Sequence, residues 1–155
     1  MTPQLADIIA MREGRRPFMD LEWFAIDTDG SLAVFITSGF AAVPLCALAD
    51  EGKFQALSAE IHHLPATSAV IPVYYPMAEL APSFVEFAAQ GLYVYDWDHQ
   101  ISWYEPNLPY SLMARPQNPI HWKQLGNVPA PPDLPLHFEK SPHITIEQHF
   151  RELNV

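Results

Sequence analysis

Residues Glu22 to Thr37 have the sequence EWFAIDTDGSLAVFIT, and this stretch decides the fold. Two runs rich in β-branched and aromatic residues, 22–27 and 32–37, are separated by Thr28-Asp29-Gly30-Ser31. An Asp-Gly pair between two alternating apolar runs is a strong signal for a β-hairpin. Residues two apart in a strand share a face, so we expect these groupings: Phe24 with Ile26, and Leu32 with Val34 and Ile36.

A second stretch, Gly91 to Asp98, has the clearest strand pattern in the chain. Because side chains alternate along a strand, Tyr93, Tyr95 and Trp97 are expected on one face. Leu92 and Val94 are expected on the other. Asp98-His99-Gln100 is then expected to turn the chain into a strand at 101–104. This would make a second hairpin.

Three helices are expected around these strands. A short amphipathic helix is predicted from Thr2 to Arg16, and a second helix from about Asp50 to His63, where acids lie at its start and Pro65 stops it. Pro82 starts a third helix that ends before Gly91. Between the second and third helices, Val70 to Tyr75 is expected to be a buried strand.

The last third of the chain is rich in proline. Nine of the sixteen prolines fall between Pro106 and Pro142, and proline removes a hydrogen-bond donor from a strand. Short runs there, such as Tyr110 to Ala114, are therefore expected to be edge strands or extended segments. The sequence predicts one α+β domain over 1–155, with 106–142 wrapped on it. The sheet should be mainly antiparallel and twisted, with two or three helices packed on one face.

Composition indicates a globular protein of a reducing compartment. The chain has 155 residues, 49% of them hydrophobic, and one cysteine, Cys46, which excludes an internal disulfide. We expect a cytoplasmic protein without a secretory signal. The uncharged stretch 30–49 is long enough to cross a bilayer, but Gly39 and Pro44 interrupt it. A strand followed by a helix start is the preferred interpretation, and no membrane association is expected.

Negative charge is concentrated in the middle of the chain. From Pro17 to Ala114 there are twelve acids and one base, Lys53, so this segment carries −11 and the two ends together carry +1. Such a charge repels nucleic acid and anionic membranes and attracts cationic surfaces. The alternative is that the acidity only keeps the protein soluble.

The segment Phe24 to Leu32 resembles the first motif of haloacid-dehalogenase-type phosphatases. That motif is an apolar strand ending in Asp-x-Asp-Gly-Thr/Ser. The resemblance implies that Asp27 attacks the phosphoryl group and Asp29 acts as acid and base, beside a magnesium ion. The later acidic pair that such enzymes carry is missing beyond Asp98. A plain hairpin turn is the preferred interpretation, with the phosphatase as the alternative function.

Other chemistry-bearing residues do not form a complete set. The acids of the turn lack the glycine and closing glutamate of a calcium loop, and the seven histidines lack the spacing of a zinc site. Cys46 lies in an apolar run and is interpreted as a buried structural cysteine. We therefore expect no catalytic residue, no metal and no cofactor.

Aromatic residues ringed by carboxylates are suited to contact with arginine- and lysine-rich proteins. Four aromatic residues are candidates for a platform near Asp96, Asp98 and Glu105: Trp97, Trp103, Tyr104 and Tyr110. A small-ligand pocket under the 91–104 hairpin is a further alternative. The predicted partner-binding residues are Asp27, Asp29, Asp96, Asp98, Trp103, Tyr104 and Glu105.

Two segments resemble small acidic immunity-type proteins of bacteria, over about 50 residues. One is Trp23 to Asp27 with Asp29-Gly30 and the following run to Ser38-Gly39-Phe40; the other is Gly91 to Asp96. Proteins of that kind are encoded beside secreted toxins and block them by direct contact. The resemblance implies a non-enzymatic protein that neutralises a basic protein partner, as an immunity protein neutralises a bacterial toxin. It does not decide between a monomer and a homodimer.

Overall fold

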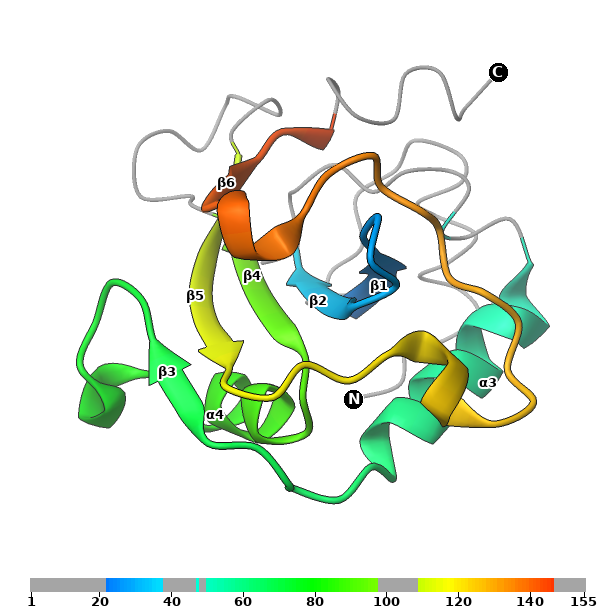
Figure 1. Cartoon of the computed structure of the whole chain (residues 1–155), viewed down its shortest axis with the longest axis horizontal. Helices are drawn as coiled ribbons and strands as arrows, with labels where there is room; N and C mark the ends of the chain where they lie inside the picture. Colours follow the sequence, from blue (N-terminus) through cyan, green and yellow to red (C-terminus); the bar gives the residue numbers. More distant parts are fainter. Residues whose placement is uncertain (1–21, 38–46, 48–49, 98–108, 147–155) are drawn as a thin grey trace.

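A curled sheet carries the fold (Figure 1). The computed structural model describes residues 22–37, 47, 50–97 and 109–146. Within these residues the strands have the order β1-β2-β4-β5-β3, and β6 pairs with β5 beside β3. The elements in chain order are β1 (Glu22–Ile26), β2 (Leu32–Ile36), α3 (Glu51–His62), β3 (Val70–Pro72), η1 (Met77–Glu79), α4 (Pro82–Ala89), β4 (Tyr93–Trp97), β5 (Tyr110–Pro116), η2 (Trp122–Leu125), η3 (Phe138–Lys140) and β6 (His143–Ile144).

The predicted fold class is confirmed. β1 and β2 form the expected hairpin, with Glu22 opposite Ile36 and Ile26 opposite Leu32. Four of the five strand pairs are antiparallel, and the exception is the parallel pair of β2 with β4. The sequence did not predict this parallel pair, because the crossover between the two strands is a long segment that includes α3 and α4.

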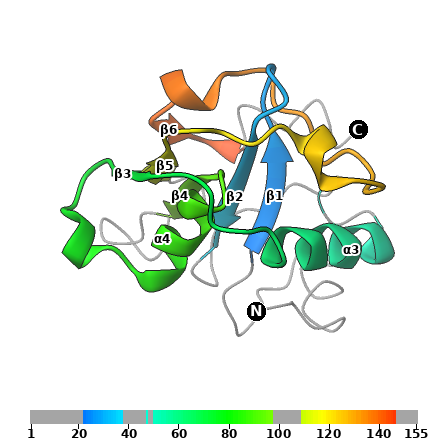
Figure 2. The ribbon, with the colours of Figure 1, turned by 60° about the horizontal axis from the view of Figure 1, so that its bottom comes forward.

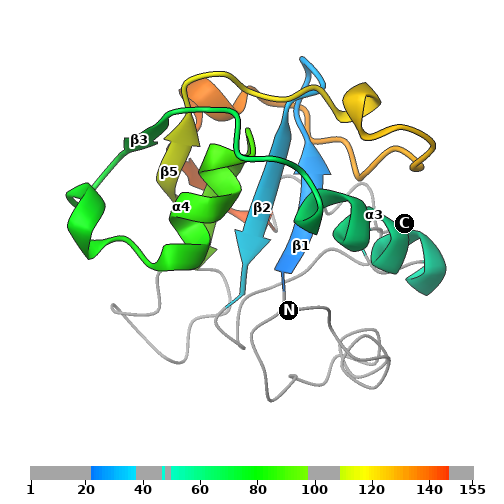
Figure 3. The same ribbon diagram turned by 90° about the horizontal axis from the view of Figure 1, so that it is seen from below.

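Both described helices cover one face of the sheet (Figure 2, Figure 3). α3 begins at its N-cap Asp50, whose side chain accepts a hydrogen bond from the Lys53 N–H at 3.0 Å. α4 begins at Pro82, as predicted, and Gly91 follows it with a φ of 100°. Side chains from both helices meet the aliphatic side of the hairpin in one cluster, including Leu57, Ile61, Phe87, Phe24 and Val34.

The aromatic side of the sheet is filled by the C-terminal third of the chain. Trp23, Phe35 and Tyr95 form a stack across β1, β2 and β4, with ring centroids 4.1 Å and 4.8 Å apart. Phe138 packs edge-on against Phe35 at 6.2 Å. Leu134, Phe138, Ile144 and Ile146 belong to the same cluster. The predicted alternation of β4 is confirmed, since Tyr93, Tyr95 and Trp97 lie on this side and Leu92 and Val94 on the other.

Burial in this cluster raises the pKa of its tyrosines. The pKa of Tyr95 and of Tyr110 is raised, in both cases mainly because burial disfavours the phenolate. The folded state therefore keeps the phenolic protons at a pH where the unfolded chain, with an ordinary tyrosine pKa of about 10, releases them. Stability from this source is complete below pH 10 and is lost as the pH rises further.

We expect the free energy of unfolding to fall by roughly 1.4 kcal/mol per pH unit for each such tyrosine above about pH 10. The Tyr110→Phe variant should show a shallower fall, because it has one proton fewer to release on unfolding. Urea unfolding at a series of alkaline pH values measures both slopes. Parallel slopes for the two proteins would contradict the assignment.

Three sequence-based expectations for the sheet need correction. Tyr110 to Ala114 is not an edge strand: β5 is interior, with β4 on one side and β3 and β6 on the other. This is possible because its flanking prolines, Pro109 and Pro116, lie at its ends, so the residues between them keep their donors. Val70 to Tyr75 is not a buried strand either, because β3 ends at Pro72 and is half-buried at the edge.

The predicted second hairpin is the third correction. Over its described length β4 has β2 on one side and β5 on the other, so these two strands occupy both edges of Tyr93–Trp97. The predicted helix at 2–16 and the strand at 101–104 lie outside the described residues, as does Cys46. No helix in the described ranges is long and apolar enough to span a bilayer.

Candidate functional site

Asp27 is the structural centre of the hairpin turn. The residue is buried, with 4% of its surface exposed. Oδ1 accepts hydrogen bonds from the Asp29 N–H at 3.0 Å and the Ser31 N–H at 2.9 Å, which fixes the turn. Oδ2 accepts one from the Phe138 N–H at 3.0 Å. One side chain therefore ties the first hairpin to the C-terminal third of the chain, and Asp27, which was predicted to bind a partner, is buried.

The C-terminal third holds the same turn from both sides. The Trp122 N–H donates to the Gly30 carbonyl at 3.0 Å, and the Leu134 N–H donates to the Ile26 carbonyl at 2.8 Å. Gly30 has a φ of 78°, and a Cβ placed there would lie 2.2 Å from the His121 ring. The glycine of the Asp-Gly pair is thus required both by the turn and by the segment that covers it.

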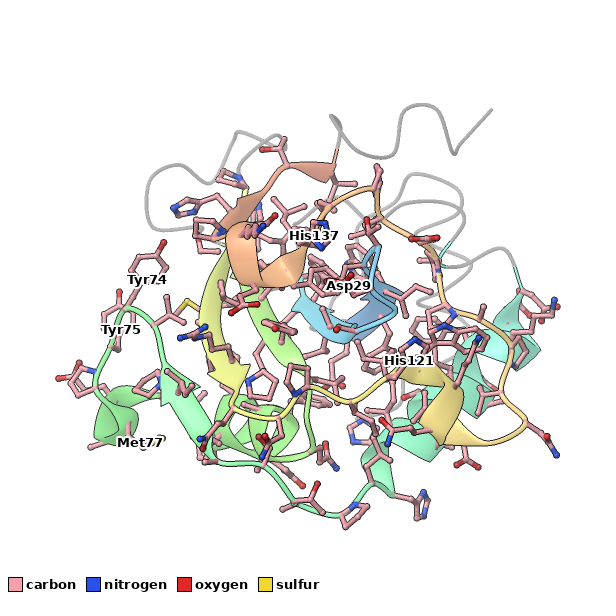
Figure 4. All side chains as sticks on the ribbon, in the orientation of Figure 1. Asp29, Tyr74, Tyr75, Met77, His121 and His137 are labelled. Carbon is pink, nitrogen blue, oxygen red and sulfur yellow. The ribbon has the colours of Figure 1, made fainter. Side chains whose placement is uncertain are left out.

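Asp29 points outward from the turn and contacts His137 (Figure 4). Its Oδ2 lies 2.8 Å from Nδ1 of His137, and the Asp29 side chain is 67% exposed. Asp27, Asp29 and His137 each offer one ligand-type atom, and these atoms lie within 4.8 Å of one another. Two carboxylates and an imidazole have the chemistry to hold a divalent cation. However, main-chain donors engage both oxygens of Asp27, and Asp29 engages His137, so the group is satisfied by its own contacts.

This geometry does not fit the phosphatase alternative. A nucleophilic carboxylate needs an oxygen open to the phosphoryl group, whereas both oxygens of Asp27 are buried and accept main-chain hydrogen bonds. Asp96 also cannot complete the site. β4 runs parallel to β2, with Asp96 opposite Ile36, so Asp96 lies at the end of the sheet remote from the turn.

Comparison with protein-family models, with curated proteins and with solved structures finds no match to this chain.

The predicted partner-binding residues therefore separate to two ends of the sheet. Asp29 lies at the turn between β1 and β2, and Asp96 lies near the end of β4, beside Glu22 and Ile36 in neighbouring strands. Trp97 and Tyr110 are buried in the aromatic cluster, so they cannot form an exposed platform. The remaining predicted residues lie outside the described residues: Asp98, Trp103, Tyr104 and Glu105.

A row of polar side chains crosses the sheet at the Asp96 end. Asp96 on β4 is opposite Ser111 on β5, and Ser111 is opposite His143 on β6. Ser111 Oγ lies 3.1 Å from Nδ1 of His143, and Nε2 of His143 lies 3.0 Å from the hydroxyl of Tyr74. Side chains of directly opposite residues share a face, so this row leads from Asp96 to the loop after β3.

That loop is the feature that sequence reasoning missed. Val73, Tyr74 and Tyr75 are exposed, although 70–75 was predicted to be a buried strand, and Met77, the first residue of η1, is exposed beside them. The flanking Pro72 and Pro76 were the available signal, because each removes a strand donor. Figure 4 shows Tyr74, Tyr75 and Met77 together at the left edge of the view, apart from Asp29, His121 and His137, which lie nearer its middle.

The described residues also line a groove between α3 and the proline-rich segment. It has a volume of about 250 Å³, and its walls include Phe24, Lys53, Phe54, Leu57 and Pro131. The small-ligand alternative placed a pocket under the 91–104 hairpin, whose part beyond Trp97 lies outside the described residues. On the aromatic side of β4, Leu134 and Phe138 belong to the buried cluster.

Proposed function

We propose that this chain is a non-enzymatic protein that binds one basic protein partner and neutralises it. The observation that carries the proposal is an acidic layer on the helix side of the sheet. α3, η1, α4 and the α3 N-cap contain one base, Lys53, and the following acids: Asp50, Glu51, Glu60, Glu79 and Glu86. Within the described residues no ion pair involves Glu60, Glu79 or Glu86, and all three are exposed.

The layer on the aromatic side of the sheet is close to neutral, so the negative charge is concentrated on the helix side. From Leu134 to Ile146, the segment that fills the aromatic side, there are one base, Lys140, and one acid, Glu139. Lys123 lies in η2, whose Leu125 belongs to the helix-side cluster. Arg115 and Glu139 pair with each other at 3.8 Å. A cationic protein that approaches this domain is therefore attracted to the helix side. The electrostatic field of these carboxylates increases the association rate more than it increases the affinity.

A basic bacterial toxin is the partner class that we favour. The two segments that resemble immunity-type proteins, Trp23 to Phe40 and Gly91 to Asp96, support this choice. The acidic helix layer supports this choice independently. It attracts a cationic enzyme, such as one that cleaves nucleic acid, and it repels nucleic acid itself.

The test compares two triple variants with the same change in charge. The immobilised protein first captures its partner from cells of the organism that encodes it, and the partner is then purified for stopped-flow association. Neutralising the helix side, with Glu60→Gln, Glu79→Gln and Glu86→Gln, should slow association about tenfold at low salt. The control neutralises three acids outside α3, η1 and α4, with Asp29→Asn, Asp133→Asn and Glu139→Gln, and should change the rate by about twofold or less.

We expect a 1:1 complex with a basic protein and an association rate that falls steeply as salt is added to the wild type. An association rate independent of salt, or equal slowing by both triple variants, would show that the helix-side charge does not direct binding. A captured partner that is acidic would overturn the proposed function.

A further inference from the structure

The loop that follows β3 is an exposed apolar surface. Tyr74 is 50% exposed, Tyr75 43% and Met77 41%, with Val73 beside them. Over the described ranges of the chain, every other large apolar side chain is buried or half-buried. Four exposed apolar residues within five positions are a concentration that soluble proteins keep for contact surfaces. Tyrosine and methionine are among the residues enriched at such surfaces.

Tyr74 is held in place before any partner arrives. Its ring stacks on His143, with centroids 5.9 Å apart and planes inclined by 30°. The His143 ring is in turn fixed between the Tyr74 hydroxyl and Ser111. An aromatic side chain that is already ordered loses little conformational entropy on binding, which favours affinity.

The charge around the loop selects a cationic partner. No lysine or arginine occurs between Lys53 and Arg115. Glu79 is exposed two positions beyond Met77, and Asp96 lies at the far end of the row that reaches Tyr74 through His143. Arg115, on the neighbouring strand, is paired with Glu139. Aromatic rings in acidic surroundings attract guanidinium and ammonium groups through cation–π contacts.

The edge of β3 is unsuited to adding a strand from another protein. The Gln117 N–H, directly after β5, donates to the Ala69 carbonyl, and the Val73 N–H donates to the Met113 carbonyl of β5. The main-chain N–H and C=O groups of successive strand residues point to opposite edges of the strand. Those of Val70 and Pro72 therefore point away from β5. Pro72 has no N–H to offer, so this edge cannot continue a ladder of hydrogen bonds. Recognition at this place must therefore use side chains.

We propose that Tyr74, Tyr75 and Met77 form the contact centre through which this chain binds a cationic protein surface. Arginine and lysine side chains of the partner stack on the two tyrosine rings, and the exposed Glu79 supplies negative charge beside them. This inference rests on the proposed function and deepens it, because the helix-side charge alone does not say where the partner docks.

The probe is a twelve-residue peptide of alternating arginine and glycine, titrated into the ¹⁵N-labelled chain. We expect the largest amide shifts at 73–79, and none with a peptide in which glutamate replaces arginine. Tyr74→Ala combined with Tyr75→Ala should weaken binding about tenfold. The Tyr74→Phe variant, which keeps the ring, should bind within about threefold of the wild type.

The matched control removes exposed neutral side chains elsewhere, with Gln55→Ala and Gln124→Ala, and should bind as the wild type does. Peptide shifts centred on Asp29, or equal affinity of the tyrosine variant and the control, would overturn the contact centre and leave the proposed function standing. Dimerisation of the wild type that the tyrosine variant abolishes would assign the loop to a second copy of this chain. That result would also overturn the inference.

Discussion

Replacing Asp27 by alanine should cost about 3–5 kcal/mol of folding free energy, which is a large share of the stability of a domain this size. The carboxylate accepts three main-chain hydrogen bonds, two within the turn and one from Phe138. Without it, these N–H groups lose a charged acceptor. An unpaired buried donor costs roughly 1–3 kcal/mol. Urea unfolding measures the loss, and hydrogen exchange at the Phe138 amide reports its local origin.

The neighbouring aspartate provides the matched control. Asp29→Ala removes an exposed carboxylate that contacts only His137 among the described residues, so it should cost about 1 kcal/mol or less. Asp27→Asn should fall between the two alanine variants, because its amide can replace one oxygen as acceptor but not both. Similar losses for Asp27→Ala and Asp29→Ala would contradict the anchoring role of Asp27.

The second large effect is expected at Phe35, the ring around which the aromatic side of the sheet is packed. It stacks between Trp23 and Tyr95 and receives the edges of Tyr110 and Phe138 at 5.2 Å and 6.2 Å. Phe35→Ala should destabilise the fold by about 3–5 kcal/mol, since it opens a cavity that several large rings cannot close. Chemical denaturation gives the free energy, and the near-ultraviolet circular dichroism should lose intensity.

A phenylalanine on the other side of the sheet serves for comparison. Phe84 on α4 is only half-buried, so Phe84→Ala should cost clearly less than Phe35→Ala. Phe35→Leu should recover part of the loss, because it refills some of the volume. Equal costs for Phe84→Ala and Phe35→Ala would show that the aromatic stack does not centre on Phe35.

Local signals predicted the local structure well. The Asp-Gly pair located the first hairpin, Pro82 and Gly91 bounded α4, and the alternation of Tyr93, Tyr95 and Trp97 assigned their faces. Each of these features depends on residues close together in the sequence. The parallel pairing of β2 with β4 depends on a crossover of more than fifty residues, and periodicity within each strand does not specify its neighbour.

The candidate site was harder to predict for the same reason. Sequence alone places Asp27 in a turn. Its burial depends on the segment around Phe138, whose N–H donates to the carboxylate from 111 positions away. Likewise, the exposure of Tyr74 and Tyr75 follows from the end of β3 at Pro72. An apolar run such as 70–75 has the same composition whether it is an interior strand or an exposed loop. The strand pairing distinguishes the interior strand from the exposed loop, because β3 and β6 share one edge of β5.

The dependence of the first hairpin on the last third of the chain has a consequence for synthesis. Trp23 and Phe35 emerge from the ribosome early, but Leu134 and Phe138, which cover them, follow about a hundred residues later. At a typical elongation rate of about 5–20 residues per second, their apolar surface stays bare for several seconds. We therefore expect the nascent chain to be a substrate for chaperones during that interval, because the segment that carries Phe138 can cover this surface only after it has been synthesised.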